Sequence, residues 1–219
     1  QAGTAYIDVE DRSKRLPLNE GGVLTKSILN NIQTGFGLTN AEINRLKGYS
    51  KAVGYLESDN EYEIEQKGGG PGSGYYQVEV GDNALGGKAG SGSNEVSINR
   101  FLTYADENNI DDPSVDEIRK LRGQNIRFSQ LSKDQQDAIF FANFVMHPRT
   151  KTKDLAKGTL SYEDAWLDTH WAGHYDKDEK GNLIANEVRR EEKRTEMSKK
   201  LGEIKELTSK LYEGLFENG

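Results

Sequence analysis

The chain lacks several residue types on which whole classes of site and scaffold depend. It has no cysteine in 219 residues, which excludes disulfide bonds, a cysteine nucleophile and thiolate-bound metal sites within this chain. Only four prolines and three histidines are present. No apolar run approaches the roughly 20 residues of a transmembrane helix, and no signal-peptide pattern opens the sequence. We therefore expect no membrane span.

Basic residues are also in deficit. The chain has 29 Lys and Arg against 36 Asp and Glu, which gives a formal net charge of -7. Nucleic acids and anionic membranes are bound through clustered Lys and Arg, so the charge argues against both as general partners. Hydrophobic residues make up only 34% of the chain and charged residues 30%, which predicts a modest core and a heavily charged surface.

The length suits one domain with appendages at its ends. Residues 1–20 show mixed charge and little periodicity, so we expect an N-terminal arm there. Residues 21–185 carry the helical and glycine-rich patterns of a folded domain, and 186–219 form a long, charged helical extension. Helical patterns dominate and strand signals are confined to one short region. The predicted class is α+β, mainly helical, with a small sheet lobe and a long charged C-terminal helix.

Two helices are marked by caps. One begins at Thr39 or Asn40, and its apolar stripe ends beside Glu57. The other opens with a capping box formed by Ser132 and Gln135, and it is apolar nearly all round, as expected of a helix in the middle of the domain. Further helices are predicted over residues 21–33, 94–107 and 186–216. Two more are expected from Asp112, a cap before a first-turn proline, and from Ser161, which repeats the capping signal with Asp164.

Residues 67–92 hold most of the glycine and form the one convincing strand region. In the strand expected after the glycines, alternation places Tyr75, Gln77 and Glu79 on one face. The opposite face, formed by Tyr76 and its alternating apolar neighbours, is predicted to belong to the core. We expect the first face to line a cleft.

The end of the helix before the glycine-rich loop carries a candidate for acid catalysis. A glycosidic oxygen leaves readily only if it is protonated as the bond breaks, so the enzyme needs a carboxylic acid that still holds its proton. Apolar surroundings favour the protonated form of a carboxyl group. Glu57 lies at the end of a buried stripe and is the candidate general acid. Gln77 would hydrogen-bond the acid or the substrate, and Glu79 would hold or activate a water molecule.

Two stretches around this acid resemble a known family. Leu56-Glu57-Ser58 followed by Gly74-Tyr75-Tyr76-Gln77-Val78-Glu79 is similar to the paired motifs of the lysozyme-like superfamily, nearest to soluble lytic transglycosylases and goose-type lysozymes. The specific match spans about 40–80, and a weaker one extends through 166–173. The glycine-rich run 66–72 is similar to versions in bacteriophage virion proteins, where such a domain is a tail or ejected cell-wall lysin.

The resemblance implies a site and a reaction. It implies Glu57 as general acid, Gln77 as a cleft residue and Glu79 in the place of an acidic residue that positions water. The substrate-binding residues predicted on these grounds are Ser58, Tyr75, Gln77 and Trp171. The implied enzyme cleaves the β-1,4 bond between N-acetylmuramic acid and N-acetylglucosamine in peptidoglycan, by hydrolysis or with a 1,6-anhydro product, and needs no cofactor.

The setting implied is a phage virion that acts in the bacterial periplasm or cell wall. The N-terminal arm and the C-terminal helix would suit contacts with other virion proteins. The alternative is a structural tail or core protein that keeps the lysozyme-like fold with weak or lost activity.

The sequence patterns for zinc, calcium or phosphate binding are weaker. His170 and His174 are spaced like a helical zinc pair, but no Glu lies between them, and His147 is placed to cap a helix end. Residues 176–187 mimic a calcium loop, with a lysine where an oxygen ligand is required. The glycine-rich loop lacks the Gly-Lys-Ser/Thr ending of a phosphate-binding loop. Trp166 is predicted to belong to the core, while Trp171 belongs to the core or stacks on a sugar.

Overall fold

The structure is a computed structural model that describes residues 22–66, 68, 72–79, 93–124, 126–169 and 175–208. The predicted arm over 1–20 therefore lies outside the described residues, as do Trp171, His170 and His174. So do most of the glycine-rich loop and its continuation after residue 79.

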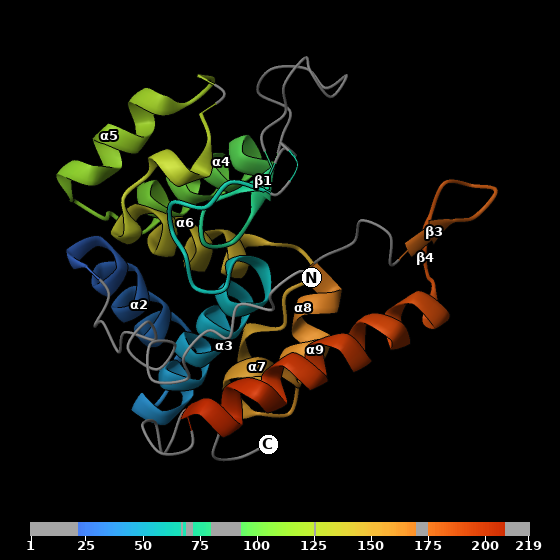
Figure 1. Cartoon of the computed structure of the whole chain (residues 1–219). Helices are drawn as coiled ribbons and strands as arrows, with labels where there is room; N and C mark the ends of the chain where they lie inside the picture. The colour runs from blue at the N-terminus through green and yellow to red at the C-terminus, as the bar shows by residue number, and fades with distance from the viewer. Residues whose placement is uncertain are drawn as a thin grey trace, which may run out of the picture.

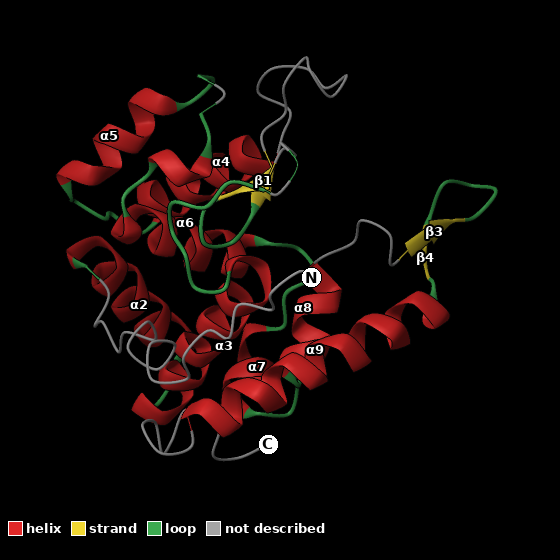
Figure 2. Cartoon of the chain, in the orientation of Figure 1, coloured by secondary structure: helices red, strands yellow, loops and turns green. Residues whose placement is uncertain are grey.

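Helices make up most of the described chain (Figures 1 and 2). In chain order they are α2 (Val23–Phe36), α3 (Asn40–Ser58), α4 (Ser93–Glu107), α5 (Pro113–Leu121), the short 3-10 helix η2 (Phe128–Gln130), α6 (Lys133–Met146), α7 (Thr152–Lys157), α8 (Tyr162–Thr169) and α9 (Glu187–Thr208). The predicted class, mainly helical with a small antiparallel sheet, is confirmed. None of the described helices is long and apolar enough to cross a membrane.

The first hairpin differs from the predicted strand. It pairs β1 (Gly72–Ser73) with β2 (Val78–Glu79) in antiparallel register, and residues 74–77 form the turn between them. The prediction of one strand through 75–79 was wrong because the backbone reverses here, with φ of 75° at Gly74 and 46° at Gln77. Strand alternation therefore fails, and Tyr75 and Tyr76 are both buried.

Helix α6 lies at the centre of the fold, as its apolar pattern predicted. Ser132 caps it and forms the expected capping box with Gln135. Helices α2 and α4 pack on it (Figure 1), and the side chains of Ala138, Ile139 and Ala142 are fully buried. A helix surrounded on several sides must be apolar nearly all round, which is why this segment shows little amphipathic pattern.

The N-terminus of α2 is held from α6 rather than by a local cap. The carboxylate of Asp134, in the first turn of α6, accepts hydrogen bonds from the backbone N–H of Leu24 at 3.0 Å and of Thr25 at 2.8 Å. The hydroxyl of Thr25 donates in turn to the backbone carbonyl of Asp134. An anion at a helix N-terminus satisfies otherwise unpaired donors and complements the helix dipole.

Helix α3 follows its predicted bounds closely. Thr39 caps it in a capping box with Glu42, and it ends at Ser58 with Asp59 in the left-handed conformation. Its stripe is buried at Ile43, Leu46, Tyr49 and Val53, which anchors the helix in the core. Glu57 therefore lies in the last turn.

The C-terminal helix α9 packs along α8 and α3 (Figure 1). Met197 and Leu201 of this helix are buried, and Arg190 and Arg194 form ion pairs with Asp168 and Asp164 of α8. The rest of the predicted extension, residues 209–219, lies outside the described residues. Helix α7 and the hairpin β3 (Tyr175–Lys177) with β4 (Leu183–Ala185) were not predicted.

Candidate functional site

Glu57 lies in the last turn of α3 and is partly buried. The indole Nε1–H of Trp166, on α8, donates a hydrogen bond to its Oε1 at 3.2 Å. Trp166 also packs against the hydrophobic core, as predicted. The candidate acid is thus held between two helices, with an aromatic side chain fixing the direction of its carboxyl group.

A cluster of aromatic rings surrounds Tyr49, which precedes Glu57 on α3. Tyr49, two turns earlier on α3, is buried and tilts against Phe144, Tyr162 and Phe140 at ring-centre distances of 5.2, 5.6 and 6.2 Å. Burial raises the pKa of Tyr49, the hydroxyl of Thr169 partly offsets this, and the charges of Glu57 and Asp168 raise the pKa further. Glu57 is therefore close enough to this aromatic cluster for its charge to act on the buried Tyr49 hydroxyl.

The turn of the first hairpin packs directly on the last turns of α3. The ring of Tyr75 lies on Gly54, where an added Cβ would be 1.6 Å from Cε1 of the ring. The hydroxyl of Tyr75 donates to Oδ1 of Asn60 at 2.6 Å, just beyond the end of the helix. Glycine at position 54 is thus what allows the hairpin to approach the helix end that carries Glu57.

Two of the predicted substrate-binding residues lie inside the fold. The side chain of Ser58 is 3% exposed, and its hydroxyl donates to the carbonyl oxygen of Gly54 at 2.8 Å. Tyr75 is 1% exposed, with its ring stacked on Tyr62 at 4.2 Å. In this structure both residues pack against Gly54, about one helical turn before Glu57 on α3.

The other two predicted residues of the hairpin lie nearer the surface. Gln77 is partly buried, and its side-chain amide donates to the carbonyl oxygen of Gly74 at 3.0 Å, within its own turn. Glu79 is exposed on β2, opposite Gly72 in the strand pairing. The structure thus brings Tyr75 to the end of α3, while Gln77 and Glu79 belong to the turn and the outer part of the hairpin.

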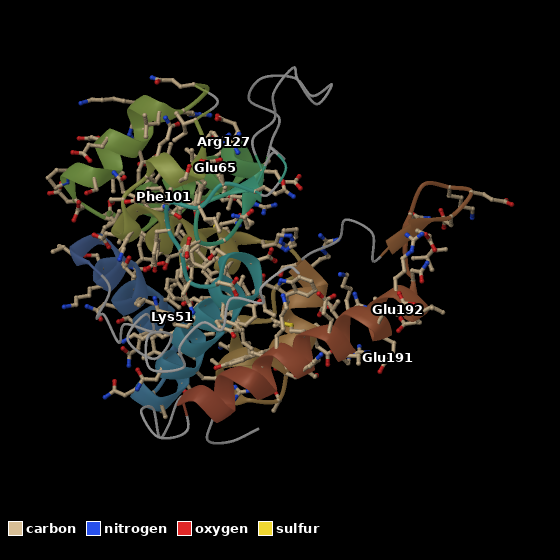
Figure 3. All side chains as sticks on the ribbon, viewed as in Figure 1. Lys51, Glu65, Phe101, Arg127, Glu191 and Glu192 are labelled. Atoms are coloured by element: carbon tan, nitrogen blue, oxygen red, sulfur yellow. The ribbon has the colours of Figure 1, made fainter. Side chains whose placement is uncertain are left out.

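The outer face of the hairpin is held by a polar group shared with η2. The Glu65 carboxylate binds the guanidinium of Arg127, its neighbour in Figure 3, and accepts a hydrogen bond from the hydroxyl of Ser129. Arg127 also reaches the carbonyl oxygen of Gly72 at 3.3 Å. The strand pair is therefore fixed on its outer side as well as on Gly54.

Sequence reasoning missed the polar residues of α6 that hold the hairpin from inside. Gln136 and Asp137 are 0% and 8% exposed, and both bind the residues around the first hairpin. A signal was present, because polar residues inside a helix that is apolar nearly all round must be buried and need partners. The link from Trp166 to Glu57 had no such signal, since 109 residues separate them.

Among the described residues, no group of three or more His, Cys, Asp or Glu side chains is placed so that it could bind a metal ion. Asp178, in the calcium-like stretch, accepts hydrogen bonds from the backbone N–H of Lys180 and Asn182 and from the Asn182 amide. Its carboxylate closes the turn between β3 and β4.

Comparisons with protein-family models, with curated proteins and with solved structures found no significant match.

Proposed function

We propose that this chain is a peptidoglycan-cleaving glycosidase, a lytic transglycosylase or muramidase, with Glu57 as its general acid. The observation that carries the proposal is the place of Glu57 at a helix end, partly buried, bound by Trp166 and flanked by a hairpin turn packed on Gly54. A carboxyl group held in a fixed direction beside aromatic rings suits proton transfer to a glycosidic oxygen.

In the proposed reaction, protonated Glu57 gives its proton to the leaving oxygen between N-acetylmuramic acid and N-acetylglucosamine. Positive charge then develops on the muramoyl sugar. The resulting Glu57 carboxylate can take the proton of the muramoyl 6-hydroxyl, which closes the 1,6-anhydro ring. In the hydrolytic version, a water molecule held near Glu79 attacks instead, and the Glu57 carboxylate takes the water proton, which restores the acid. Neither version requires a metal or an organic cofactor.

The test is lysis of purified bacterial cell walls, followed by loss of turbidity. We expect wild-type protein to lyse them and Glu57→Gln to lower the rate by about 100-fold or more, because an amide cannot donate the proton. Glu63→Gln is the matched control, since Glu63 is an exposed carboxylate in the loop after the same helix. Lysis by Glu57→Gln at the wild-type rate would refute the assignment.

Mass spectrometry of the released fragments distinguishes the two versions. Anhydro ends mark ring closure, whereas reducing ends mark hydrolysis. If hydrolysis is found, Glu79→Gln should slow it, and if only anhydro ends form, Glu79 has no water to position.

A structural role, as a phage tail or core component, is the second candidate. It is favoured by the hairpin β3–β4 and the start of α9, which project from the rest of the described molecule in Figure 1. Ile184 and Val188, in this projection, are 51% and 72% exposed, which suits contact with another protein. Absence of lysis by folded wild-type protein on walls of several bacterial types would favour this role.

A further inference from the structure

A buried carboxylate that the proposed reaction does not use joins the hairpin to α6. We define the hairpin segment as residues 59–66 and 72–79. The hydroxyl of Tyr62 donates to the Asp137 carboxylate, 2.9 Å from each oxygen, and the hydroxyl of Tyr76 donates to its Oδ1 at 2.7 Å. Gln136, the preceding residue of α6, accepts from the backbone N–H of Tyr75 and donates to the carbonyl oxygen of Tyr62. Two successive side chains of α6 thus bind both halves of the hairpin segment.

The charges around Asp137 come from two helices. Lys51 of α3 donates from Nζ to the Tyr62 hydroxyl at 3.2 Å and lies 5.2 Å from the centre of the Tyr75 ring. On α6, Lys133 lies over the Tyr62 ring, and Asp134 opposes a negative charge at Asp137. Burial raises the pKa of Asp137, while Lys51 and the two tyrosine hydroxyls lower it.

The tyrosine hydroxyls are matched to a charged acceptor. Burial and the charge of Asp137 raise the pKa of Tyr62 and of Tyr76, so both keep their protons and remain donors. A carboxylate can accept from both at once, and Lys51 then donates to the free lone pair of Tyr62. A leucine at position 137 would avoid burying a charge, but it would leave two buried hydroxyls without their acceptor.

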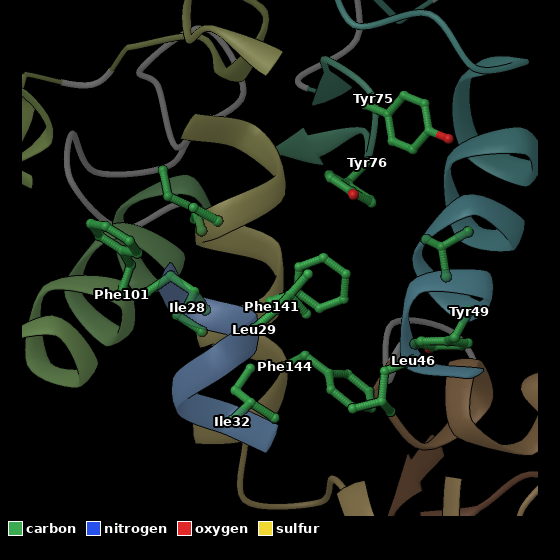
Figure 4. Packing of buried hydrophobic residues seen from close by; sticks show 14 of the residues in the cluster. Ile28, Leu29, Ile32, Leu46, Tyr49, Tyr75, Tyr76, Phe101, Phe141 and Phe144 are labelled. Atoms are coloured by element: carbon green, nitrogen blue, oxygen red, sulfur yellow. The ribbon is translucent and has the colours of Figure 1, made fainter. Parts of the chain in front are cut away.

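Two chains of contacts lead from Asp137 to the end of α3. In the first, Tyr62 stacks on Tyr75, whose ring lies on Gly54 and whose hydroxyl binds Asn60. In the second, Tyr76 stacks on Phe140 at 4.1 Å, and Phe140 contacts Tyr49. Figure 4 shows Tyr75 and Tyr76 between the hairpin and α3. Both chains end within one or two helical turns of Glu57.

From this geometry we propose that Asp137 is a positioning residue. It clamps the hairpin segment onto α6 through Tyr62 and Tyr76, and so holds the hairpin turn against the end of α3 that carries Glu57. The proposal rests on the proposed function for its catalytic part. The clamp itself is a structural claim that can be tested without any substrate.

The test uses Tyr76→Phe and Tyr62→Phe, each of which removes one hydroxyl and keeps the stacked ring. Tyr104→Phe is the matched control, because the Tyr104 hydroxyl also donates to a side-chain oxygen, that of Asn31, but joins α4 to α2. Amide hydrogen exchange is measured by mass spectrometry on peptides covering 72–79. The reporters are the amides of Gly74, Tyr75 and Gln77, which donate to Ile64, Gln136 and Gly74.

We expect either hairpin variant to raise exchange in 72–79 by about 10-fold or more, with exchange in α2 unchanged, and Tyr104→Phe to leave 72–79 at the wild-type rate. The same variants should lower the maximal rate of wall lysis more than they change the wall concentration at half-maximal rate. Unchanged exchange in both hairpin variants would overturn the clamp. Faster exchange with full lytic activity would overturn its positioning role. If wild-type protein lyses no wall, the proposed function fails, and the exchange result still decides the clamp.

Discussion

At the scale of single residues, Gly54 has the sharpest steric role near the candidate acid. It lies inside α3, where glycine is otherwise unfavourable compared with alanine. An added methyl group would overlap the ring of Tyr75, which is buried and stacked on Tyr62 and so cannot move aside cheaply. Close packing of the Tyr75 ring therefore explains glycine at this position, which helix propensity alone would not favour.

We expect Gly54→Ala to lower the free energy of unfolding by about 1–3 kcal/mol, because the ring and the hairpin turn must shift. It should also reduce lysis. Gly35→Ala is the control, since Gly35 lies in α2 with nothing within 4 Å of an added Cβ. That change should stabilise the protein by roughly 0.5–1 kcal/mol. Urea unfolding of both variants gives the two values, and shifts of the same sign would contradict this account.

The position of the candidate acid was predictable at this scale, whereas its partner was not. The spacing of apolar residues from Ile43 to Leu56 is local information, and it correctly placed Glu57 at a helix end. Trp166 comes from another helix far along the chain, and only the folded arrangement of α3 and α8 brings its indole N–H to Glu57.

At the scale of secondary-structure elements, α2 depends on α6 for its N-terminal cap. Gly22, at the cap position, has no side chain to offer, and a Cβ there would overlap the Asp134 carboxylate. The first turn of α6 therefore supplies the N-terminal cap of α2.

Asp134→Ala should cost about 0.5–2 kcal/mol of stability, because two backbone donors of α2 lose their acceptor. Asp116→Ala is the control, since Asp116 is an exposed charge in the first turn of α5 whose ion pair, with Arg119 at 3.8 Å, lies within its own helix. A surface change of that kind should stay within about 0.5 kcal/mol. Thermal unfolding measures both, and equal losses would show that Asp134 acts only as a charge in the first turn of its own helix.

Elements with local signals were predicted well, and those without them were not. The caps Thr39, Asp112 and Ser132 are each followed by the expected helix, because capping involves residues only a few positions apart. The first hairpin was misjudged because Gln77 adopts a left-handed conformation that is uncommon for a residue other than glycine. Contacts with α3 and α6 outweighed the strand propensity of the two tyrosines.

At the scale of the whole molecule, several carboxylates pull the pH dependence of stability in opposite directions. Hydrogen bonds and ion pairs lower the pKa of Asp106, Asp178 and Glu42, so their contributions are present above the ordinary carboxyl pKa and are lost as pH falls. Asp137 is the opposite case, because burial raises its pKa above the ordinary value of 3.8. The stability curve of the wild-type protein alone therefore mixes both effects.

A comparison of wild type with Asp137→Asn isolates the contribution of Asp137. Between the ordinary value of 3.8 and its raised pKa in the fold, the folded state holds a proton that the unfolded chain has released. The stability due to this proton is fully present below that window and is lost as pH rises through it, at about 1.4 kcal/mol for each unit by which the pKa is raised. Asn cannot titrate, so its stability relative to wild type should increase as pH rises. Urea unfolding at a series of pH values from about 4 to 8 measures the difference. A difference that stays constant or shrinks with rising pH would show that the fold does not favour the protonated form of Asp137.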